Sequence, residues 1–433
     1  MAEADCAIWR GAGCMSASTV LGRKRSTCND DGMNRPKLLV LASTYPARTG
    51  DGTPQFVRDL ATAEAMGYDT TVLVPSVPGG ASRESDGALR VRRFRYFPRR
   101  WEDLADGAIL ENLRSRKSRW AQVLPLFVAE ILAIRREVRA AKPDIIHAHW
   151  LIPQGLAALI AAPGVPKIVT SHGGDIYGLR DRVSRKLINT VLRNTDAVTT
   201  VNTQMRDRLL ELGAEPATTV VLSMGADVEA IRPLAAAVER RTGRIVFVGR
   251  LVEKKGVSVL LEALRLLVED RYDLRVVGDG PMRSQLTRES SGLSATFTGV
   301  LGREALAAEL GSASIAVFPS VPAASGDQDG LPVALLEAMS VGCAVVASDL
   351  PGLRDAVEDG VSGLLVTPGS AEELAAALRR LLGDPQLRDQ LGRSASARAE
   401  GFSVEAIGGR YVALLDEVCA RRKGETAPLL ASS

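Results

Sequence analysis

The chain has 433 residues, of which 46% are hydrophobic and 24% charged, a composition typical of soluble globular proteins and unlike that of disordered or fibrous ones. This length exceeds what one hydrophobic core usually holds, so we expect two domains of roughly 200 residues each. The formal net charge of +3 is too small to indicate a nucleic-acid partner, and we expect none.

The cysteines and the apolar segments indicate the compartment. The five cysteines form no CxxC pair or metal-ligand spacing, which favours a reducing cytoplasm. The longest apolar segment, 123–134, is shorter than the roughly 18 residues that a membrane span needs and contains Glu130, so we expect no span. The amino-terminal residues lack a basic region followed by an apolar stretch, which argues against a secretory signal.

Both ends of the chain read as extensions of the folded part. Residues 1–33 are expected to be disordered, and residues 421–433 to form a loose tail. Met33 stands just before the first strand pattern, so one hypothesis is that translation starts at Met33 and not at Met1.

Short β-branched runs alternate with helix-period segments along the chain, the pattern of parallel sheets covered by helices. The first half has six such runs, and the second half starts the pattern again with six more. The predicted strands are 38–42, 70–74, 144–147, 167–170, 197–201, 219–222, 245–248, 274–277, 295–298, 314–318, 344–347 and 363–366. The fold class is therefore α/β, with two doubly wound, Rossmann-like domains.

The same pattern sets the expected domain boundaries. A first domain at 34–232 is followed by a linker at 233–243, which is rich in Ala and charge and lacks a strong period. A second domain covers 244–402, and a helix at 403–420 closes the fold and packs back toward the first domain. Doubly wound domains bind ligands outside the carboxyl ends of their strands, so residues just after strands are the best candidates for function.

Cations and glycines meet after the strand at 245–248. Gly249 and Arg250 are followed by Lys254, Lys255 and Gly256, at the start of a predicted helix. A helix amino end presents free N–H groups and partial positive charge, which together with Arg and Lys suit a diphosphate. The alternative is a solvated basic turn. A second turn, 278–281 (Gly-Asp-Gly-Pro), follows the next strand. Its glycines can be explained without a ligand, by a cramped crossing of backbone segments.

The most specific pattern lies at 327–339. Asp329 stands in the loop before a helix whose first residue is predicted to be Pro332, and Glu337 lies about 7.5 Å further along the axis. Two carboxylates at different heights can hold hydroxyls on two linked rings, while the free N–H groups of Gly330 and Leu331 can meet phosphate. The alternative is a helix cap at Asp329 and a solvent-facing Glu337.

These motifs together resemble the retaining GT-B glycosyltransferases of family 4, including bacterial exopolysaccharide and colanic-acid-type enzymes. The motifs are Gly249-Arg250, Lys255-Gly256, Gly278-Asp279-Gly280-Pro281, Asp329-Gly330-Leu331-Pro332 and Glu337-Ala338-Met339, and the likeness runs from about residue 37 to 418. The resemblance implies that Arg250 and Lys255 bind the donor diphosphate and that Glu337 binds the ribose. It also implies that the first carboxylate of the pair contacts the donor sugar.

One position departs from the family pattern. That first carboxylate is Asp329, where the family has Glu, and the spacing to Glu337 is kept. Asp is one methylene shorter, and a misplacement of about 1 Å near the chemistry can cost on the order of 100-fold in rate. Either the loop moves in, or the donor sugar differs, or Asp327 shares the contact; the sequence leaves these three open.

All three histidines lie in the predicted first domain. His147 and His149 share one face of a strand end, and His172 follows the next strand in Ser-His-Gly-Gly-Asp, so that with Asp175 they could complete a metal site. The resemblance implies instead that His172 lies near the donor sugar and positions it, which makes His172 and Asp329 the predicted catalytic residues. For His147 and His149, structural packing and substrate contact remain equal alternatives.

A loop with Gly50, Gly52 and Thr53 follows the first strand. The resemblance implies that these glycines let the backbone approach the donor diphosphate and the acceptor. The alternative is an ordinary strand-to-helix turn.

Cations and aromatic residues gather between positions 90 and 120. They are Arg90, Arg92, Arg93, Phe94, Arg95, Tyr96, Phe97, Arg99, Arg100, Trp101, Arg114, Arg116, Lys117, Arg119 and Trp120. Such a mixture can bind nucleic acid, an anionic leaflet or a lipid-diphosphate acceptor, or it can be a solvated face. We favour an acceptor or membrane surface at Arg92, Arg93, Arg95, Arg99 and Arg100.

The predicted function is retaining transfer of a hexose from a nucleotide-diphosphate sugar to a hydroxyl of a glycan or lipid-linked acceptor, in cell-surface polysaccharide or glycolipid synthesis. No metal or other cofactor is expected, and the protein is placed in the cytoplasm or on the inner face of the membrane. Alternatives are a nucleotide-sugar epimerase of the same fold and a catalytically weak nucleotide-sugar-binding subunit. An NAD-dependent dehydrogenase fits poorly, because the first strand lacks GxGxxG.

Overall fold

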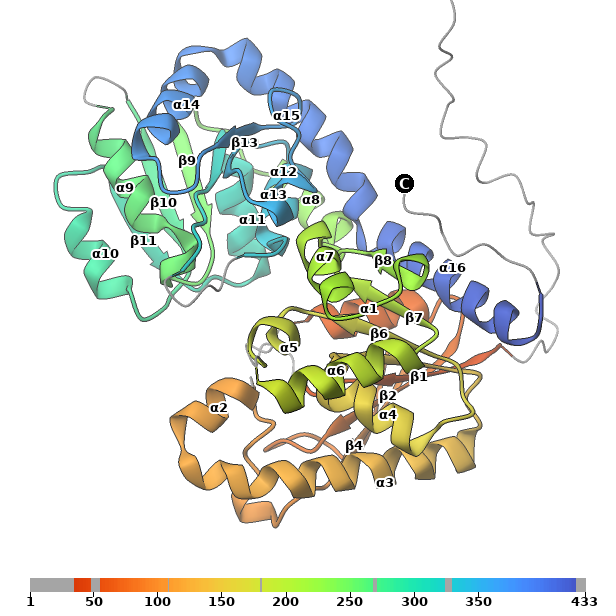
Figure 1. Ribbon diagram of the computed structural model, residues 1–433. Helices are drawn as coiled ribbons and strands as arrows, with labels where there is room; N and C mark the ends of the chain where they lie inside the picture. Colours follow the sequence, from red (N-terminus) through yellow and green to blue (C-terminus); the bar gives the residue numbers. More distant parts are fainter. Residues whose placement is uncertain are drawn as a thin grey trace, which may run out of the picture. The chain divides into compact units, whose positions relative to one another are not determined.

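The computed structural model describes residues 35–47, 55–107, 109–179, 181–267, 271–323 and 329–425. These residues form two α/β lobes, each built on one sheet (Figure 1). The predicted extension with Met33, the glycines Gly50 and Gly52, Asp327, and the tail beyond residue 425 lie outside the described residues.

The first lobe contains an eight-stranded sheet in the order β3-β4-β2-β1-β5-β6-β7-β8. Its strands are β1 (Lys37–Leu41), β2 (Asp69–Pro75), β3 (Arg83–Asp86), β4 (Leu89–Phe94), β5 (Ile145–His149), β6 (Lys167–Ser171), β7 (Ala197–Thr200) and β8 (Thr219–Val221). β3 pairs with β4 antiparallel, and the other neighbours pair in parallel.

Helices cover both faces of this sheet, as the alternation along β1 requires. Leu38 and Val40 belong to one core cluster with residues of α1 (Phe56–Glu64) and α16 (Val404–Arg422). Leu39 and Leu41 belong to another, which includes residues of α3 (Val123–Ala141), α4 (Leu156–Ala161), α6 (Arg182–Asn194) and α7 (Thr203–Glu211). Smaller helices are α2 (Ile109–Ser115) and α5 (Gly174–Tyr177).

The second lobe contains a six-stranded parallel sheet in the order β11-β10-β9-β12-β13-β14. Its strands are β9 (Arg244–Val248), β10 (Asp273–Val277), β11 (Ala295–Gly299), β12 (Ile315–Phe318), β13 (Ala344–Ser348) and β14 (Leu364–Val366). Its helices are α9 (Val257–Arg265), α10 (Arg283–Glu289), α11 (Arg303–Ser312), α12 (Val333–Ser340), α13 (Pro351–Arg354), α14 (Ala371–Gly383) and α15 (Pro385–Ala399). Ile245 and Phe247 face one core cluster and Val246 the other, so this sheet too is buried on both sides.

The closing helix packs on the first lobe, as predicted. Gly408 of α16 lies so close to α1 that an added Cβ would be 2.2 Å from the Cβ of Ala63. The hydroxyl of Tyr68 donates to Asp416 at 2.7 Å, and Tyr411 is fully buried. The helix extends to Arg422, so the first two residues of the predicted tail are helical.

All twelve predicted strands are present, with ends that differ by one or two residues. β3 and β4 were not predicted, because the exposed positions of β4 carry Arg90 and Arg92, which made the segment look like a cationic surface. The structure also differs from the prediction in the first part of the linker, which is helical. Helix α8 (Val228–Ala236) makes residues 233–236 helical despite Pro233, with its amino end capped by Asp227 and its body packed on α11.

Candidate functional site

Three loops at the carboxyl ends of β9, β10 and β12 are held together in the second lobe. Gly256 has φ +64, and a Cβ there would lie 1.8 Å from the carbonyl oxygen of Pro319. A Cβ on Gly278 would lie 1.9 Å from the Gly249 oxygen, and one on Gly280 would lie 2.4 Å from the Leu251 oxygen. Glycine is therefore required at these positions by close backbone approach, which is the cramped crossing considered for residues 278–281.

Asp329 and Lys255 meet at the centre of these loops. Lys255 Nζ lies 2.9 Å from Asp329 Oδ2, and the hydroxyl of Ser320 donates to the same oxygen at 2.6 Å. Lys254 Nζ lies 3.9 Å from the other carboxylate oxygen. Asp329 is 6% exposed and does not cap α12, whose amino end has no side-chain cap, so the cap alternative is wrong. The helix begins at Val333, with Pro332 as its N-cap and not its first residue.

Unbonded backbone N–H groups lie beside this ion pair. Within the described residues, the amides of Gly330 and Leu331 donate no hydrogen bond, although both residues are only half-exposed. The backbone of Gly330 is fixed by close packing, because a Cβ on Gly352 would lie 2.3 Å from its carbonyl oxygen. These two amides, unpaired among the described residues, directly follow the Asp329 that holds the Lys255 ammonium, and together with that ammonium they can bind an anion.

Glu337 and Arg250 complete the predicted donor residues. Glu337 is the fifth residue of α12 and is half-buried, so it does not simply face solvent. Burial raises the pKa of its carboxyl, and the positive charge of Arg303 opposes that rise. Arg250 is exposed and directly follows the turn after β9. Lys255, Gly330, Leu331 and Asp329 are thus brought together, while no contact joins them to Glu337 among the described residues.

The three histidines lie at the carboxyl ends of β5 and β6 in the first lobe. His147 is buried between Glu64, whose carboxylate is 2.6 Å from Nδ1, and Thr170, whose hydroxyl is 2.7 Å from Nε2. His149 Nδ1 lies 2.9 Å from His172 Nε2. His147 is therefore a structural histidine, and the sequence did not indicate its partners Glu64 and Thr170 because they lie 83 and 23 residues away.

The environment of His149 and His172 keeps both imidazoles neutral. Burial, with a smaller contribution from the nearby His147, lowers the pKa of His172 to about 3. Burial also lowers the pKa of His149 well below its ordinary value. Asp175 does not join them as a metal ligand. Its carboxylate accepts from the amide of Leu151 and the hydroxyl of Ser171, both at 2.7 Å. Among the described residues, no group of side chains has the arrangement of a metal site.

Some arginines of the predicted basic surface are exposed, and others are buried or bound in ion pairs. Arg93 is buried and donates to the Pro46 oxygen and to Glu84, so its assignment to the surface is wrong. Arg92 forms an ion pair with Glu137. Arg95, Arg99 and Arg100 are exposed, although Arg95 lies 3.6 Å from Glu102. The guanidinium of Arg100 lies over the ring of Trp101, 3.9 Å from its centre.

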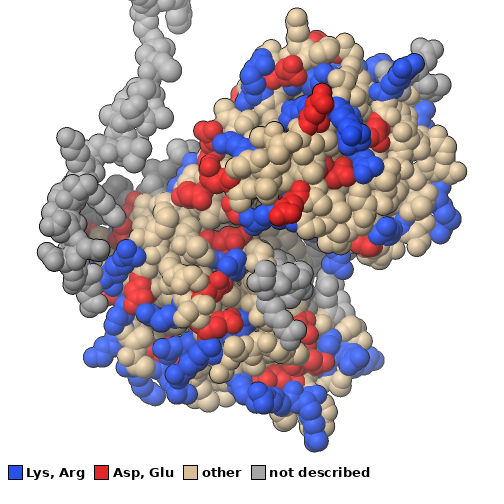
Figure 2. All heavy atoms as spheres, turned by 180° about the vertical axis from the view of Figure 1, so that it is seen from behind, with Lys and Arg blue, Asp and Glu red and all other residues tan. Residues whose placement is uncertain are grey.

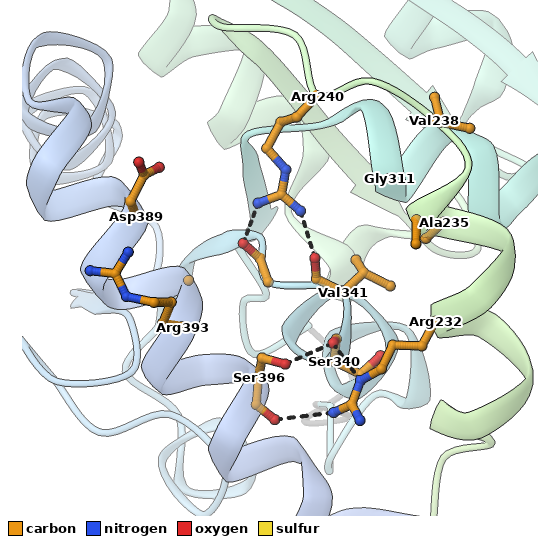
Figure 3. A pocket seen from close by; sticks show the side chains of 13 residues that line it. Arg232, Ala235, Val238, Arg240, Gly311, Ser340, Val341, Asp389, Arg393 and Ser396 are labelled. Carbon is orange, nitrogen blue, oxygen red and sulfur yellow. Dashed lines mark hydrogen bonds between the residues drawn. The ribbon is translucent and has the colours of Figure 1, made fainter.

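A cavity of about 470 Å³ lies at the carboxyl end of α12 (Figure 3). None of the predicted site residues lines it. Arg232 donates to the carbonyl of Ser340, and Arg240 donates to those of Val341 and Gly342. These arginines bind carbonyls that the last turn of α12 leaves without helical partners, which is a structural role.

The comparisons with known proteins bear on both lobes. The family model of glycosyl transferases group 1 matches residues 242–384, and that of the glycosyl transferase 4-like domain matches residues 51–225. A glycogen synthase of Mycobacterium tuberculosis is 31% identical over 308 residues, which are 67% of this chain and 72% of that protein. The chain belongs to the glycosyl transferases group 1 family. The family predicted from the donor-side motifs is thus confirmed.

Two further relatives of this glycosyltransferase match over a smaller share of their own length than the glycogen synthase does. A sulfoquinovosyl transferase of Arabidopsis thaliana is 29% identical over 69% of this chain, and the amylovoran biosynthesis glycosyltransferase AmsK of Erwinia amylovora is 30% identical over 60%. The chain spans 62% and 66% of these two proteins, a little under two thirds of each.

Solved structures confirm the predicted GT-B fold. A sucrose-phosphate synthase from Thermosynechococcus elongatus has a TM-score of 0.70 and 21% identity, covering 89% of this chain and 100% of that one. An Anabaena protein in complex with UDP-glucose has a TM-score of 0.63 and 19% identity, covering 88% and 99%. In the part of the chain that the structure describes, no helix is both long and apolar enough to span a bilayer.

Proposed function

We propose that the protein is a glycosyltransferase that moves a hexose from a nucleotide-diphosphate sugar to a hydroxyl of a glycan or lipid-linked acceptor, with retention at the anomeric carbon. The observation that carries the proposal is the group formed by Lys255 and the amides of Gly330 and Leu331, which have no partner in the described part of the chain, in a member of this family. AmsK is named for amylovoran biosynthesis, and a Salmonella typhimurium relative, 30% identical over 64% of this chain, for colanic acid biosynthesis. These names favour cell-surface polysaccharide or glycolipid synthesis as the setting.

The donor diphosphate is proposed to bind Arg250, Lys255 and the two amides. These groups would be fixed where negative charge develops as the nucleotide leaves, which is where stabilisation lowers the barrier most. Glu337 would accept hydrogen bonds from the ribose hydroxyls. Burial raises the pKa of this half-buried carboxyl, and such donors would stabilise its ionised form. The nucleotide sugar is the co-substrate, and the proposal uses no metal or other cofactor.

His172 is proposed to contact the donor sugar from the first lobe. Its pKa of about 3 makes it a neutral imidazole at physiological pH, so it would position a sugar hydroxyl by hydrogen bonding and would not supply positive charge. Asp329 would lie close to both the sugar and the phosphate. It would act by holding the ammonium of Lys255 in place.

The first experiment is a melting-temperature screen against UDP, GDP, ADP and their sugars. A ligand at 100 times its dissociation constant adds about 2.7 kcal/mol to the stability of the folded state, so the correct nucleotide should stand out. Transfer to an acceptor is then measured with the sugar of that nucleotide. A chain that binds none of the nucleoside diphosphates would contradict the proposal, and one that isomerises the free donor sugar would be an epimerase.

We also propose that the first lobe contacts an anionic membrane from the cytoplasmic side. Three apolar side chains of α3, Leu124, Val128 and Leu132, are 70%, 46% and 57% exposed. They are spaced four residues apart and therefore lie along one side of the helix. Trp101 and Trp120 are also exposed, at 53% and 62%, and Trp120 lies in the turn directly before α3.

Cations accompany this apolar surface. Arg99, Arg100, Arg116 and Lys117 are exposed in the segments next to the two tryptophans. Figure 2 shows Lys and Arg side chains, with Asp and Glu among them, over the lower part of the view, which carries α2 and α3 in Figure 1. Each such cation near an anionic bilayer contributes about 1 kcal/mol. The proposed membrane surface therefore keeps Arg99 and Arg100 of the sequence prediction and adds α3.

Flotation with liposomes tests this surface. Vesicles containing phosphatidylserine should carry the protein upward, and vesicles of phosphatidylcholine alone should carry much less. Leu124→Asp should weaken flotation, whereas Val300→Asp should not, because Val300 is equally exposed, at 78%, but lies in the second lobe. Equal binding to both vesicle types would remove the electrostatic part of the proposal.

A further inference from the structure

Three imidazole rings stack in the first lobe. The rings of His147 and His149 have centroids 4.4 Å apart, and those of His149 and His172 are 5.2 Å apart and nearly parallel, at 17°. Tyr411 stacks on His147 at one end, and Phe56 packs against His172, 4.9 Å away, at the other. The stack leads from the buried core of the lobe to the half-buried His172.

His149 is the middle ring and has no role in the site described so far. It is fully buried, and its Nδ1 forms the hydrogen bond to His172 Nε2. Its Nε2 is also buried and has no hydrogen-bond partner. A half-turn of the ring would keep its plane but would take Nδ1 away from His172 Nε2 and break that hydrogen bond, while the neighbouring His147 is held by Glu64 and Thr170.

The unpartnered nitrogen determines where the protons lie. A neutral imidazole carries one N–H and one bare nitrogen, and a buried N–H without an acceptor is rarer in proteins than a buried acceptor without a donor. The proton of His149 is therefore on Nδ1, and Nε2 is bare. It follows that His149 donates to His172 Nε2, and that the proton of His172 is on Nδ1.

We propose that His149 is a positioning residue that fixes His172 as the Nδ1–H tautomer, so that Nδ1–H is presented as a donor to the sugar of the nucleotide substrate. Within the described residues, Nδ1 of His172 has no hydrogen-bond partner, and it is free for this role. The part of the proposal that concerns the sugar rests on the proposed function. The tautomer itself does not.

The experiment is nitrogen NMR of protein labelled with ¹⁵N-histidine. The chain has only three histidines, so the substitutions at each position assign all signals. At neutral pH we expect a protonated Nδ1 and a bare Nε2 in His172. In His149→Leu the donor is lost, and His172 should return toward the Nε2–H form that free imidazole prefers. A wild-type His172 protonated on Nε2 would overturn the proposal.

Kinetics provide the second measurement. His149→Leu should lower kcat about 10- to 100-fold, the scale of a misplaced catalytic contact, while KM for the nucleotide sugar changes less than about threefold. His149→Asn can keep an N–H near the position of Nδ1, and it should recover most of the tautomer and of kcat. If the Asn and Leu variants are equally impaired with unchanged His172 signals, His149 has only a structural role and the proposal is wrong.

These two measurements separate the proposal from the proposed function. If the wild-type protein transfers no sugar but the His172 signals respond to His149→Leu and not to His149→Asn, the function fails and the tautomer assignment stands. If transfer is observed but the His172 tautomer does not depend on His149, the positioning proposal fails alone.

Discussion

Glu130 is a buried acid whose substitution should stabilise the protein at alkaline pH. It lies on α3, is 1% exposed, and neither carboxylate oxygen has a hydrogen-bond partner. The side chain next to it is Gln154, whose carbonyl oxygen is also buried without a partner. Burial disfavours the ionised carboxylate, and the neighbouring Gln154 offsets this only in part by lowering the pKa, so the folded protein favours the neutral acid.

The pKa sets the size and the pH range of the effect. Burial raises the pKa of Glu130 from 4.5 to about 8. Between these values the folded state holds a proton that the unfolded state has released, so stability falls as pH rises from about 4.5 to 8 and then levels off. A shift of this size corresponds to about 5 kcal/mol above pH 8, and to about 3 kcal/mol at pH 7.

Glu130→Gln removes the titrating group while keeping the shape of the neutral acid. We expect the variant and the wild type to be similar at pH 5, and the variant to become progressively more stable up to pH 8. Urea unfolding followed by tryptophan fluorescence suits the measurement, because three of the four tryptophans, Trp101, Trp120 and Trp150, lie in the first lobe.

Leu132→Gln is the matched control, since it changes an exposed residue of the same helix and removes no titrating group. Its effect on the free energy of unfolding should be the same at every pH. If Glu130→Gln also shows a constant difference from wild type between pH 5 and pH 9, the carboxyl is not held neutral, and the reasoning is refuted.

Three other predictions concern the donor site and the first lobe. Lys255→Ala and Glu337→Ala should each weaken binding of the nucleotide by about 1.5–3 kcal/mol, which is what a hydrogen bond to a charged group contributes. If titration calorimetry finds normal affinity in both variants, the donor binds elsewhere. Asp329→Glu should lower kcat in a single-turnover assay, because a longer side chain would move the ammonium of Lys255. Arg93→Ala should lower the free energy of unfolding by about 2 kcal/mol, while Arg99→Ala should change it little, as measured by urea unfolding.

The sequence predicted the sheets well and the contacts between loops poorly. A buried parallel strand such as β9 is a run of apolar, β-branched residues, and the run can be recognised without knowing its neighbours. β4 lacks such a run, because Arg90 and Arg92 occupy two of its outward positions and Arg93 occupies a buried one. The burial of Arg93 depends on Pro46, which is 47 residues away, and could not be read from the local pattern.

The donor side shows the same limit. The strand ends and glycines located the group around Lys255 and Asp329, since each motif follows a strand and needs no partner to be recognised. The contact between the two side chains joins residues 74 positions apart, and only the fold brings those loops together. The tight packing of Gly256 against Pro319 is what fixes that approach.

That contact gives a physical reason for Asp at position 329. One carboxylate oxygen accepts from Ser320 and holds the ammonium of Lys255, so the side chain is already engaged before a donor binds. Because Asp329 is buried and its reach is short, it can fix the ammonium beside the amides of Gly330 and Leu331 without extending into the space that a sugar would occupy. The longer side chain of a glutamate would either push the ammonium of Lys255 outward or place its carboxylate beyond the ammonium. The shorter residue therefore matches a site in which the carboxylate orients the lysine that we propose binds phosphate. For this reason a longer side chain is expected to reduce the rate of transfer more than the affinity for the nucleotide.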